Sequence, residues 1–153
     1  AQCPLAHLCA AHAAGTAVTL PRKAAPKARR IEPVTLALVR SPEGVLLQQR
    51  PEKGLLAGLW QPVLWEDESL SADEARARLA ALGVVCTPDA PKALRPARHI
   101  FSHIEWHMGG YLFTAERQPA PVGCVWSSPS QLEPAYTLPG AFKAYRKLLA
   151  AAF

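Results

Sequence analysis

The sequence contains no run of apolar residues long enough to cross a bilayer, although 50% of its 153 residues are hydrophobic. A membrane-spanning helix needs about 18 or more such residues in succession, so we expect no transmembrane segment. Charged residues make up only 19% of the chain. An apolar share this large in a chain of one ordinary domain's length is enough to form a core, which excludes a disordered protein. We therefore expect a soluble, globular domain.

Acidic residues are absent from residues 1–30. The same segment holds five basic residues, which are Arg22, Lys23, Lys27, Arg29 and Arg30. Residues 31–153 contain twelve residues of each sign, so the whole excess behind the formal charge of +5 lies in the N-terminal arm. A basic arm attached to a neutral domain indicates a polyanionic partner.

The sequence also lacks the cysteine pattern of a secreted, disulfide-bonded domain. Cys3 and Cys9 lie close together, whereas Cys86 and Cys124 lie in separate segments that we expect to be folded. There is no initiator methionine and no signal peptide, and the chain begins inside what looks like a motif. We therefore expect it to be a fragment of a longer protein.

Three stretches of different character follow one another along the chain. Residues 3–12 are rich in small helix formers and predict a short helical turn that ends at Gly15. Residues 16–30 contain Pro21 and Pro26 among alanines and basic residues, which is typical of an extended linker. The folded domain is predicted to begin near Glu32.

The domain combines strand patterns with two helix patterns. Strands are predicted at residues 34–39, 45–49, 60–65, 92–101, 104–114 and 124–126, with Gly109 and Gly110 marking a bulge. Ser71 and Glu74 form a capping-box pattern that begins a helix over 72–82, which Gly83 ends. A second helix is predicted over 140–151, after Pro139. Several antiparallel strands with two helices indicate an α+β domain.

Three clusters of residues together resemble one family. The clusters are Cys3-Pro4 with Cys9, the run from Arg50 to Trp60 (Arg-Pro-Glu-Lys-Gly-Leu-Leu-Ala-Gly-Leu-Trp), and the run from Arg98 to His103 (Arg-His-Ile-Phe-Ser-His). In this order they are similar to the C-terminal part of bacterial adenine DNA glycosylases of the MutY family, which remove adenine mispaired with 8-oxoguanine. The resemblance implies that residues 1–15 end an iron-sulfur segment, 16–31 form a basic interdomain connector and 32–153 form a Nudix-like (MutT-like) domain with a mixed sheet and two helices.

The resemblance assigns Cys3 and Cys9 as the last two of four ligands of a 4Fe-4S cluster. Four thiolates are needed to hold such a cluster, so we expect no cofactor in this fragment and a 4Fe-4S cluster only in the full-length parent. Two alternatives stay open for these residues. They are small side chains in a frayed terminus, or they bind zinc together with His7 and His12.

A Nudix-like domain could itself be a hydrolase that holds magnesium through a helix reading Arg-Glu-x-x-Glu-Glu-x-Gly. When Gly83 is matched to the last glycine, Arg76 fits the arginine, but Ala77, Ala80 and Ala81 stand where the carboxylates belong. Methyl groups offer no oxygen ligand to a hard cation, so we expect no metal site. The nearby acids are interpreted as a solvated loop and a helix N-terminus. They are Glu66, Asp67, Glu68, Asp73 and Glu74.

Ser102 is the strongest candidate for a functional side chain. Guanine presents an acceptor at N7, whereas 8-oxoguanine presents an N7 hydrogen and a C8 carbonyl, and one hydroxyl can both accept and donate. The resemblance assigns Ser102 this reading role, with Phe101 as a packing or wedging side chain and His103 as a second polar contact or a brace. The alternative is purely structural, with Phe101 in the core, Ser102 in a turn and His103 satisfied on an edge strand. His99 and His107 are assigned no role.

The sequence thus predicts the 8-oxoguanine-recognition domain of an adenine DNA glycosylase, inactive without its catalytic half. Its expected partners are duplex DNA with 8-oxoguanine opposite adenine, contacted by the phosphate-binding connector, and the N-terminal catalytic domain of the same chain. We expect a monomer, with no membrane partner, in the bacterial cytoplasm near the nucleoid. The alternatives are a Nudix hydrolase of oxidised nucleotides, and a docking module whose basic arm binds another repair protein. For the connector itself, the alternative is a soluble tether.

Overall fold

The computed structural model describes residues 3–23 and 28–151 of the chain. The N-terminal part contains the short helical elements η1 (Ala6–Leu8), α1 (Ala10–Ala13) and η2 (Ala17–Thr19). The connector is therefore not extended throughout, because η2 lies within it. In the described ranges, no helix has the length and apolar character needed to cross a membrane.

A mixed sheet of seven strands forms the centre of the described structure. In chain order the strands are β1 (Arg30–Ser41), β2 (Gly44–Gln49), β3 (Trp60–Glu66), β4 (Lys92–Ala93), β5 (Ala97–Ile100), β6 (Ile104–Thr114) and β7 (Cys124–Ser127). The order across the sheet is β4-β6-β1-β3-β2-β7, with β5 also paired to β6. β1 and β6 are parallel along their full lengths and the other pairs are antiparallel. The predicted mixed sheet is confirmed, and β1 extends beyond the strand predicted over 34–39, beginning at Arg30 and ending at Ser41.

The glycine pair in β6 marks a break in the neighbouring ladder. The register between β1 and β6 runs without interruption past Gly109 and Gly110. On the other edge of β6, Ala93 pairs with Tyr111 and Ala97 with Met108, so three residues stand opposite the two glycines. The bulge therefore lies in the partner, and the single strand predicted over 92–101 is divided into β4 and β5.

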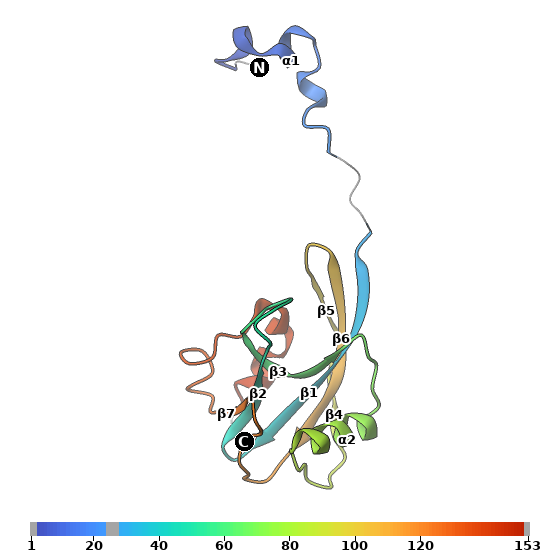
Figure 1. The fold of residues 1–153 in the computed structure, drawn as a ribbon, viewed down its shortest axis with the longest axis vertical. Helices are drawn as coiled ribbons and strands as arrows, with labels where there is room; N and C mark the ends of the chain where they lie inside the picture. Colours follow the sequence, from blue (N-terminus) through green and yellow to red (C-terminus); the bar gives the residue numbers. More distant parts are fainter. Residues whose placement is uncertain (1–2, 24–27, 152–153) are drawn as a thin grey trace.

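Two apolar clusters pack on opposite faces of the sheet, and Figure 1 shows where the sheet, α2 and the C-terminal segment lie. Successive side chains of a strand point to opposite faces. Leu36 and Leu38 of β1 therefore join the cluster beneath the C-terminal segment, whereas Ala37 and Val39 join the cluster beneath α2 (Ala72–Leu82). This arrangement places a helical layer on each face of one sheet.

α2 has the ends that the sequence predicts. The Ser71 hydroxyl accepts a hydrogen bond from the Glu74 amide, and the Glu74 carboxylate accepts one from the Ser71 amide. The Ser71 amide and then the Ser71 hydroxyl, both donating to the Glu74 carboxylate, lower the pKa of Glu74. Gly83 ends the helix in the left-handed conformation, with φ of 96°. Ala75 and Leu79 are the side chains that α2 buries against the sheet.

The segment predicted as a helix over 140–151 is helical, but it ends at Leu149 and most of it is a 3-10 helix. Residues Gly140–Tyr145 form the 3-10 helix η3, and α3 (Arg146–Leu149) is a single turn. Phe142 and Tyr145 are both buried and three residues apart, a spacing that aligns side chains on a helix with three residues per turn. The Tyr145 hydroxyl donates to the carbonyl of Arg95 at 3.0 Å, and burial raises the pKa of Tyr145 to about 12.

The two adjacent glycines of β6 have different surroundings, which gives a matched test of the fold. A Cβ on Gly110 would collide with the backbone of Leu36, and its φ is +140°, whereas a Cβ on Gly109 would meet nothing within 4 Å. We expect Gly110→Ala to lower the free energy of unfolding by about 2 kcal/mol or more, because the β1–β6 ladder must open. Gly109→Ala should change it by less than about 1 kcal/mol. Urea denaturation of both variants measures the difference, and equal losses would contradict the assigned register.

Candidate nucleic-acid interface

Phe101, Ser102 and His103 form the turn between β5 and β6, which we call the tip. The Phe101 amide donates to the carbonyl of Ile104 at 2.8 Å and closes the turn. Ser102 and His103 are exposed. Within the described part of the chain, no hydrogen bond engages the Ser102 hydroxyl, so it is free to meet a ligand. Figure 1 shows this hairpin projecting beyond the rest of the sheet, beside the start of β1.

Phe101 is partly buried and packs inward rather than standing free. Its ring makes edge contacts with the Trp106 ring at 5.0 Å and with the His99 ring at 4.6 Å, measured between centroids. Trp106 is fully buried. The geometry therefore supports packing, one of the two roles expected for Phe101, and it gives His99 a contact that the sequence did not predict.

The end of the connector lies against the tip. The Arg30 amide donates to the carbonyl of His103 at 3.1 Å, and the Arg30 guanidinium pairs with the Glu32 carboxylate. Glu32 is only 3% exposed and also accepts a hydrogen bond from Trp106 Nε1 at 3.2 Å. Arg30 is thus the first residue of β1 and holds a partner, so it is not part of a free arm.

The other connector cations are separate from this contact. Arg22, Lys23 and Arg29 are exposed, while Lys27 lies outside the described residues. Arg29 directly precedes Arg30, the residue that bonds to the tip, so the basic connector ends beside the tip in space. Positive charge at this place is suited to phosphate contacts.

Arg50 joins the second sequence cluster to the same buried tryptophan. Its guanidinium lies over the Trp106 ring at 5.8 Å from the centroid. It also donates to the carbonyl of Leu55 at 2.7 Å and to Gln61 Oε1 at 2.9 Å, and it pairs with Glu66 at 2.6 Å. The Arg50–Trp60 run and the tip, which the sequence presented as separate motifs, therefore meet at Trp106.

The three alanines that the sequence comparison placed at magnesium-ligand positions are on the surface of α2. Ala77, Ala80 and Ala81 lie exposed on α2. Among the nearby acids, Glu66 pairs with Arg50 and Glu68 pairs with Arg78 at 2.8 Å. In residues 3–23 and 28–151, no group of three or more histidine, cysteine or acidic side chains comes close enough to hold a metal ion.

In the described structure, Cys3, Cys9, His7 and His12, considered as a zinc site, do not come together as such a group. All four cysteines of the chain are free, so no disulfide framework is present. Burial raises the pKa of the Cys86 and Cys124 thiols. Cys3 and Cys9 alone do not complete the four-thiolate set of an iron-sulfur cluster.

A family model described as a NUDIX domain matches residues 34–149, which is most of the chain. The chain belongs to the NUDIX domain family. This match begins within β1 and ends at the last residue of α3, so it covers the sheet, α2 and the C-terminal segment together.

Known proteins similar to this NUDIX domain include glycosylases. Mouse adenine DNA glycosylase is 34% identical over 117 residues, which are 69% of this chain but only 23% of that protein. The C-terminal domain of mouse MUTYH, solved in complex with human PCNA, is 25% identical with a TM-score of 0.57, covering 76% of this chain and 86% of that chain. A MutT protein from Methanosarcina mazei Go1 shares the fold, with a TM-score of 0.58 at 17% identity over 79% and 94% of the two chains. The resemblance to the MutY C-terminal domain and the expected Nudix-like fold are confirmed.

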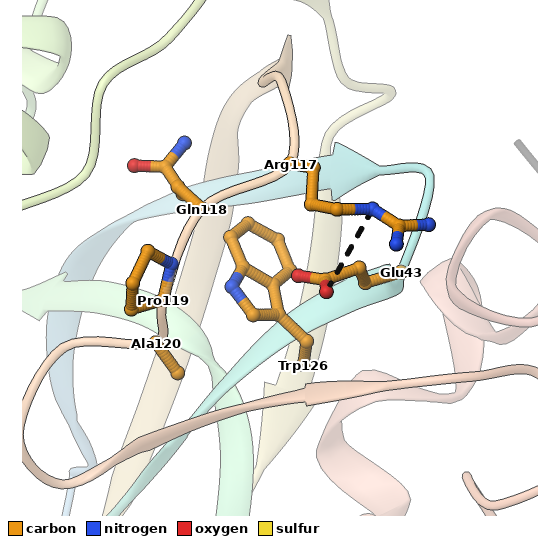
Figure 2. A pocket seen from close by; sticks show the side chains of 6 residues that line it. All are labelled: Glu43, Arg117, Gln118, Pro119, Ala120 and Trp126. Atoms are coloured by element: carbon orange, nitrogen blue, oxygen red, sulfur yellow. Dashed lines mark ion pairs between the residues drawn. The ribbon is translucent and has the colours of Figure 1, made fainter.

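A pocket of about 490 Å³ lies at the opposite end of this NUDIX domain from the tip (Figure 2). It is lined by Glu43, Arg117, Gln118, Pro119, Ala120 and Trp126. Glu43 follows the end of β1 and Arg117 follows the end of β6, whereas the tip precedes the start of β6. Because these strands are parallel and about ten residues long, roughly 30 Å separate pocket and tip. The pocket is therefore not part of the candidate interface.

Glu32, Arg50 and Trp106 are the residues of this NUDIX domain site that sequence reasoning missed. One signal was available for Glu32, because it is an acidic residue at the start of an otherwise apolar strand. Its partner Trp106 is 74 residues away, so only the β1–β6 pairing shows what Glu32 contacts.

Two buried indole N–H groups allow a matched test of the Glu32 contact. Trp106 Nε1 donates to Glu32, whereas the buried Trp126 Nε1 has no partner in the described residues. We expect Trp106→Phe to lower the free energy of unfolding by about 1–3 kcal/mol more than Trp126→Phe, because it removes a hydrogen bond to a buried carboxylate. Guanidinium denaturation measures both. A larger loss for Trp126→Phe would contradict the assigned contact.

Proposed function

We propose that this chain is the part of an adenine DNA glycosylase that recognises 8-oxoguanine opposite adenine. The observation that carries the proposal is the exposed Ser102 hydroxyl, on a projecting turn whose neighbour Arg30 ends a basic connector. The similarity to mouse adenine DNA glycosylase supports the proposal. The chain spans about a quarter of that relative's length, so the excision of adenine is proposed for a catalytic domain elsewhere in the parent protein.

Ser102 has the chemistry that this recognition needs. A hydroxyl accepts one hydrogen bond through its oxygen and donates another through its proton. Facing 8-oxoguanine, it accepts from the N7 hydrogen and donates to the C8 oxygen. Facing guanine, it can only donate to N7, so one hydrogen bond is lost. His103 is exposed beside it and supplies a second polar group at the same turn.

The connector supplies affinity without base preference. Arg22, Lys23, Lys27 and Arg29 are cations whose contacts with phosphates would release counterions from the duplex. Arg30 is a weaker phosphate ligand than these four, since it already pairs with Glu32. In the parent protein, Cys3 and Cys9 would give two of the four thiolates of a 4Fe-4S cluster, and the rest of the donor set would come from outside this chain.

The alternative of a nucleotide hydrolase draws support from membership of the NUDIX family. It is the weaker candidate because the exposed α2 surface carries Ala77, Ala80 and Ala81 where a magnesium site needs carboxylates. Magnesium-dependent hydrolysis of 8-oxo-dGTP by the purified chain would favour the hydrolase over the recognition domain.

Replacing the reading hydroxyl tests the proposal directly. We expect Ser102→Ala to reduce the preference for a duplex with 8-oxoguanine opposite adenine over one with guanine opposite adenine. The loss should be about 1–3 kcal/mol, or roughly 5- to 150-fold, if both hydrogen bonds go unreplaced. Fluorescence anisotropy at low salt, with two duplexes that differ only at this base, measures the ratio of dissociation constants.

Ser69→Ala is the matched control, because Ser69 is also exposed but lies on the loop between β3 and α2. This variant should keep the wild-type preference. An unaltered preference in Ser102→Ala would place base reading elsewhere, and a large loss of thermal stability in that variant would show Ser102 to be a structural turn residue.

Removing the connector tests its part in binding. A chain that starts at Arg30 keeps the contact with His103 but loses four cations. We expect the slope of log affinity against log salt to become shallower by up to about 4, while the ratio between the two duplexes stays within about twofold. Lys143→Ala combined with Lys147→Ala, on the exposed C-terminal surface, is the control. If truncation leaves the slope unchanged, the connector is only a tether.

A further inference from the structure

We infer that Glu32 and Trp106 are positioning residues that hold the tip in its base-reading geometry. This inference rests on the proposed function of Ser102. Neither residue can touch the base itself, because Glu32 is 3% exposed and Trp106 is fully buried. Both act through Phe101 and His103, which flank Ser102 in the chain.

Each oxygen of the Glu32 carboxylate has its own donor. One oxygen accepts from Trp106 Nε1 at 3.2 Å and the other pairs with the Arg30 guanidinium. A buried carboxylate costs stability unless it is paired, and an apolar residue of similar size often stabilises a fold more. Stability alone therefore does not explain a carboxylate at this position, whereas the need to orient its two donors does.

Both donors contact residues of the tip. Trp106, oriented by Glu32, presents its ring to the edge of Phe101 at an interplanar angle of 76°. Arg30, oriented by the same carboxylate, donates its amide to the carbonyl of His103 at 3.1 Å. The residues on both sides of Ser102 are thus tied to Glu32, while the Ser102 side chain stays exposed.

Glu32 therefore has two separate effects on binding. It raises the preference for 8-oxoguanine by holding the tip, and it lowers the affinity for any duplex by pairing with Arg30. Loss of the indole acceptor lets the tip move, and a misplaced hydroxyl makes weaker hydrogen bonds to 8-oxoguanine. Loss of the negative charge frees Arg30 and raises the affinity for any duplex, damaged or not. A residue that served only general stability would not separate these two effects.

Two substitutions at Glu32 remove the same charge but differ in the acceptor. Glu32→Gln keeps an oxygen that can accept from Trp106 Nε1, whereas Glu32→Leu does not. We expect both variants to bind an undamaged duplex more tightly than the wild type at low salt. Only Glu32→Leu should lose about 10-fold of the preference for 8-oxoguanine, and Glu32→Gln should keep it within about twofold. Anisotropy titrations with the two duplexes used for Ser102→Ala measure both quantities.

Amide hydrogen exchange tests the same inference without DNA. In Glu32→Leu the amides of Arg30 and Phe101, which donate the hydrogen bonds that define the tip, should exchange about 10-fold faster than in the wild type. The Val84 amide, which bonds to Leu79 at the end of α2, should be unaffected. If Val84 also exchanges faster, the difference between the amides decides: a larger increase at Arg30 and Phe101 than at Val84 supports the inference, and an equal increase at all three amides overturns it.

The outcomes separate this inference from the proposed function. If the wild-type chain shows no preference for 8-oxoguanine, the proposed function is wrong, and the exchange data alone decide whether Glu32 holds the tip. If Ser102→Ala abolishes the preference but Glu32→Leu retains it with unchanged exchange at Arg30, the positioning role is overturned and the reading role stands. Equal losses of preference in Glu32→Gln and Glu32→Leu would also overturn it.

Discussion

The buried indole of Trp106 is the contact on which the candidate interface depends. It receives the edge of Phe101 from the tip, the guanidinium of Arg50 from the Arg50–Trp60 run, and the ring of Phe142 from the C-terminal segment. Its only polar atom donates to Glu32. Since each of these partners comes from a different part of the chain, the tip is held by the whole domain and not by its own short turn.

The parallel pairing of β1 with β6 decides where the basic connector ends. Because β1 starts beside the start of β6, the chain that leaves the connector enters the sheet at the tip. An antiparallel pairing would have brought the connector in at the other end of β6, beside the pocket of Figure 2. The topology therefore brings the end of the basic connector and the tip to the same end of the sheet.

The proposed interface contains two kinds of residue with different roles. In the proposal, connector cations would bind phosphates, which gives affinity that depends on salt and carries no information about the base. Ser102 would read the base by hydrogen bonding, and its contribution would depend on how well the tip is held. Arg30 connects the two groups, because it ends the connector and pairs with Glu32. On α2, exposed Ala77, Ala80 and Ala81 stand at the positions where a Nudix hydrolase would carry magnesium-binding carboxylates.

Local patterns in the sequence were sufficient for the elements whose ends are determined within a few residues. The capping box of Ser71 and Glu74 and the stop at Gly83 gave α2 its observed bounds, since these hydrogen bonds span only three or four residues. For the C-terminal helix, the sequence predicted a helical segment but not its type. Most of it is a 3-10 helix, and the buried Phe142 and Tyr145 have the three-residue spacing that aligns side chains on such a helix.

The sequence by itself determined the basic connector, the missing magnesium carboxylates and the tip residues, because each is a matter of residue type within one segment. Only the tertiary structure decided that Glu32 faces Trp106 and that Arg30 bonds to His103. These partners are more than 70 residues apart, and their meeting depends on strand register. A shift of one residue in β1 would turn Glu32 to the other face of the sheet, so no local pattern could have predicted the contact.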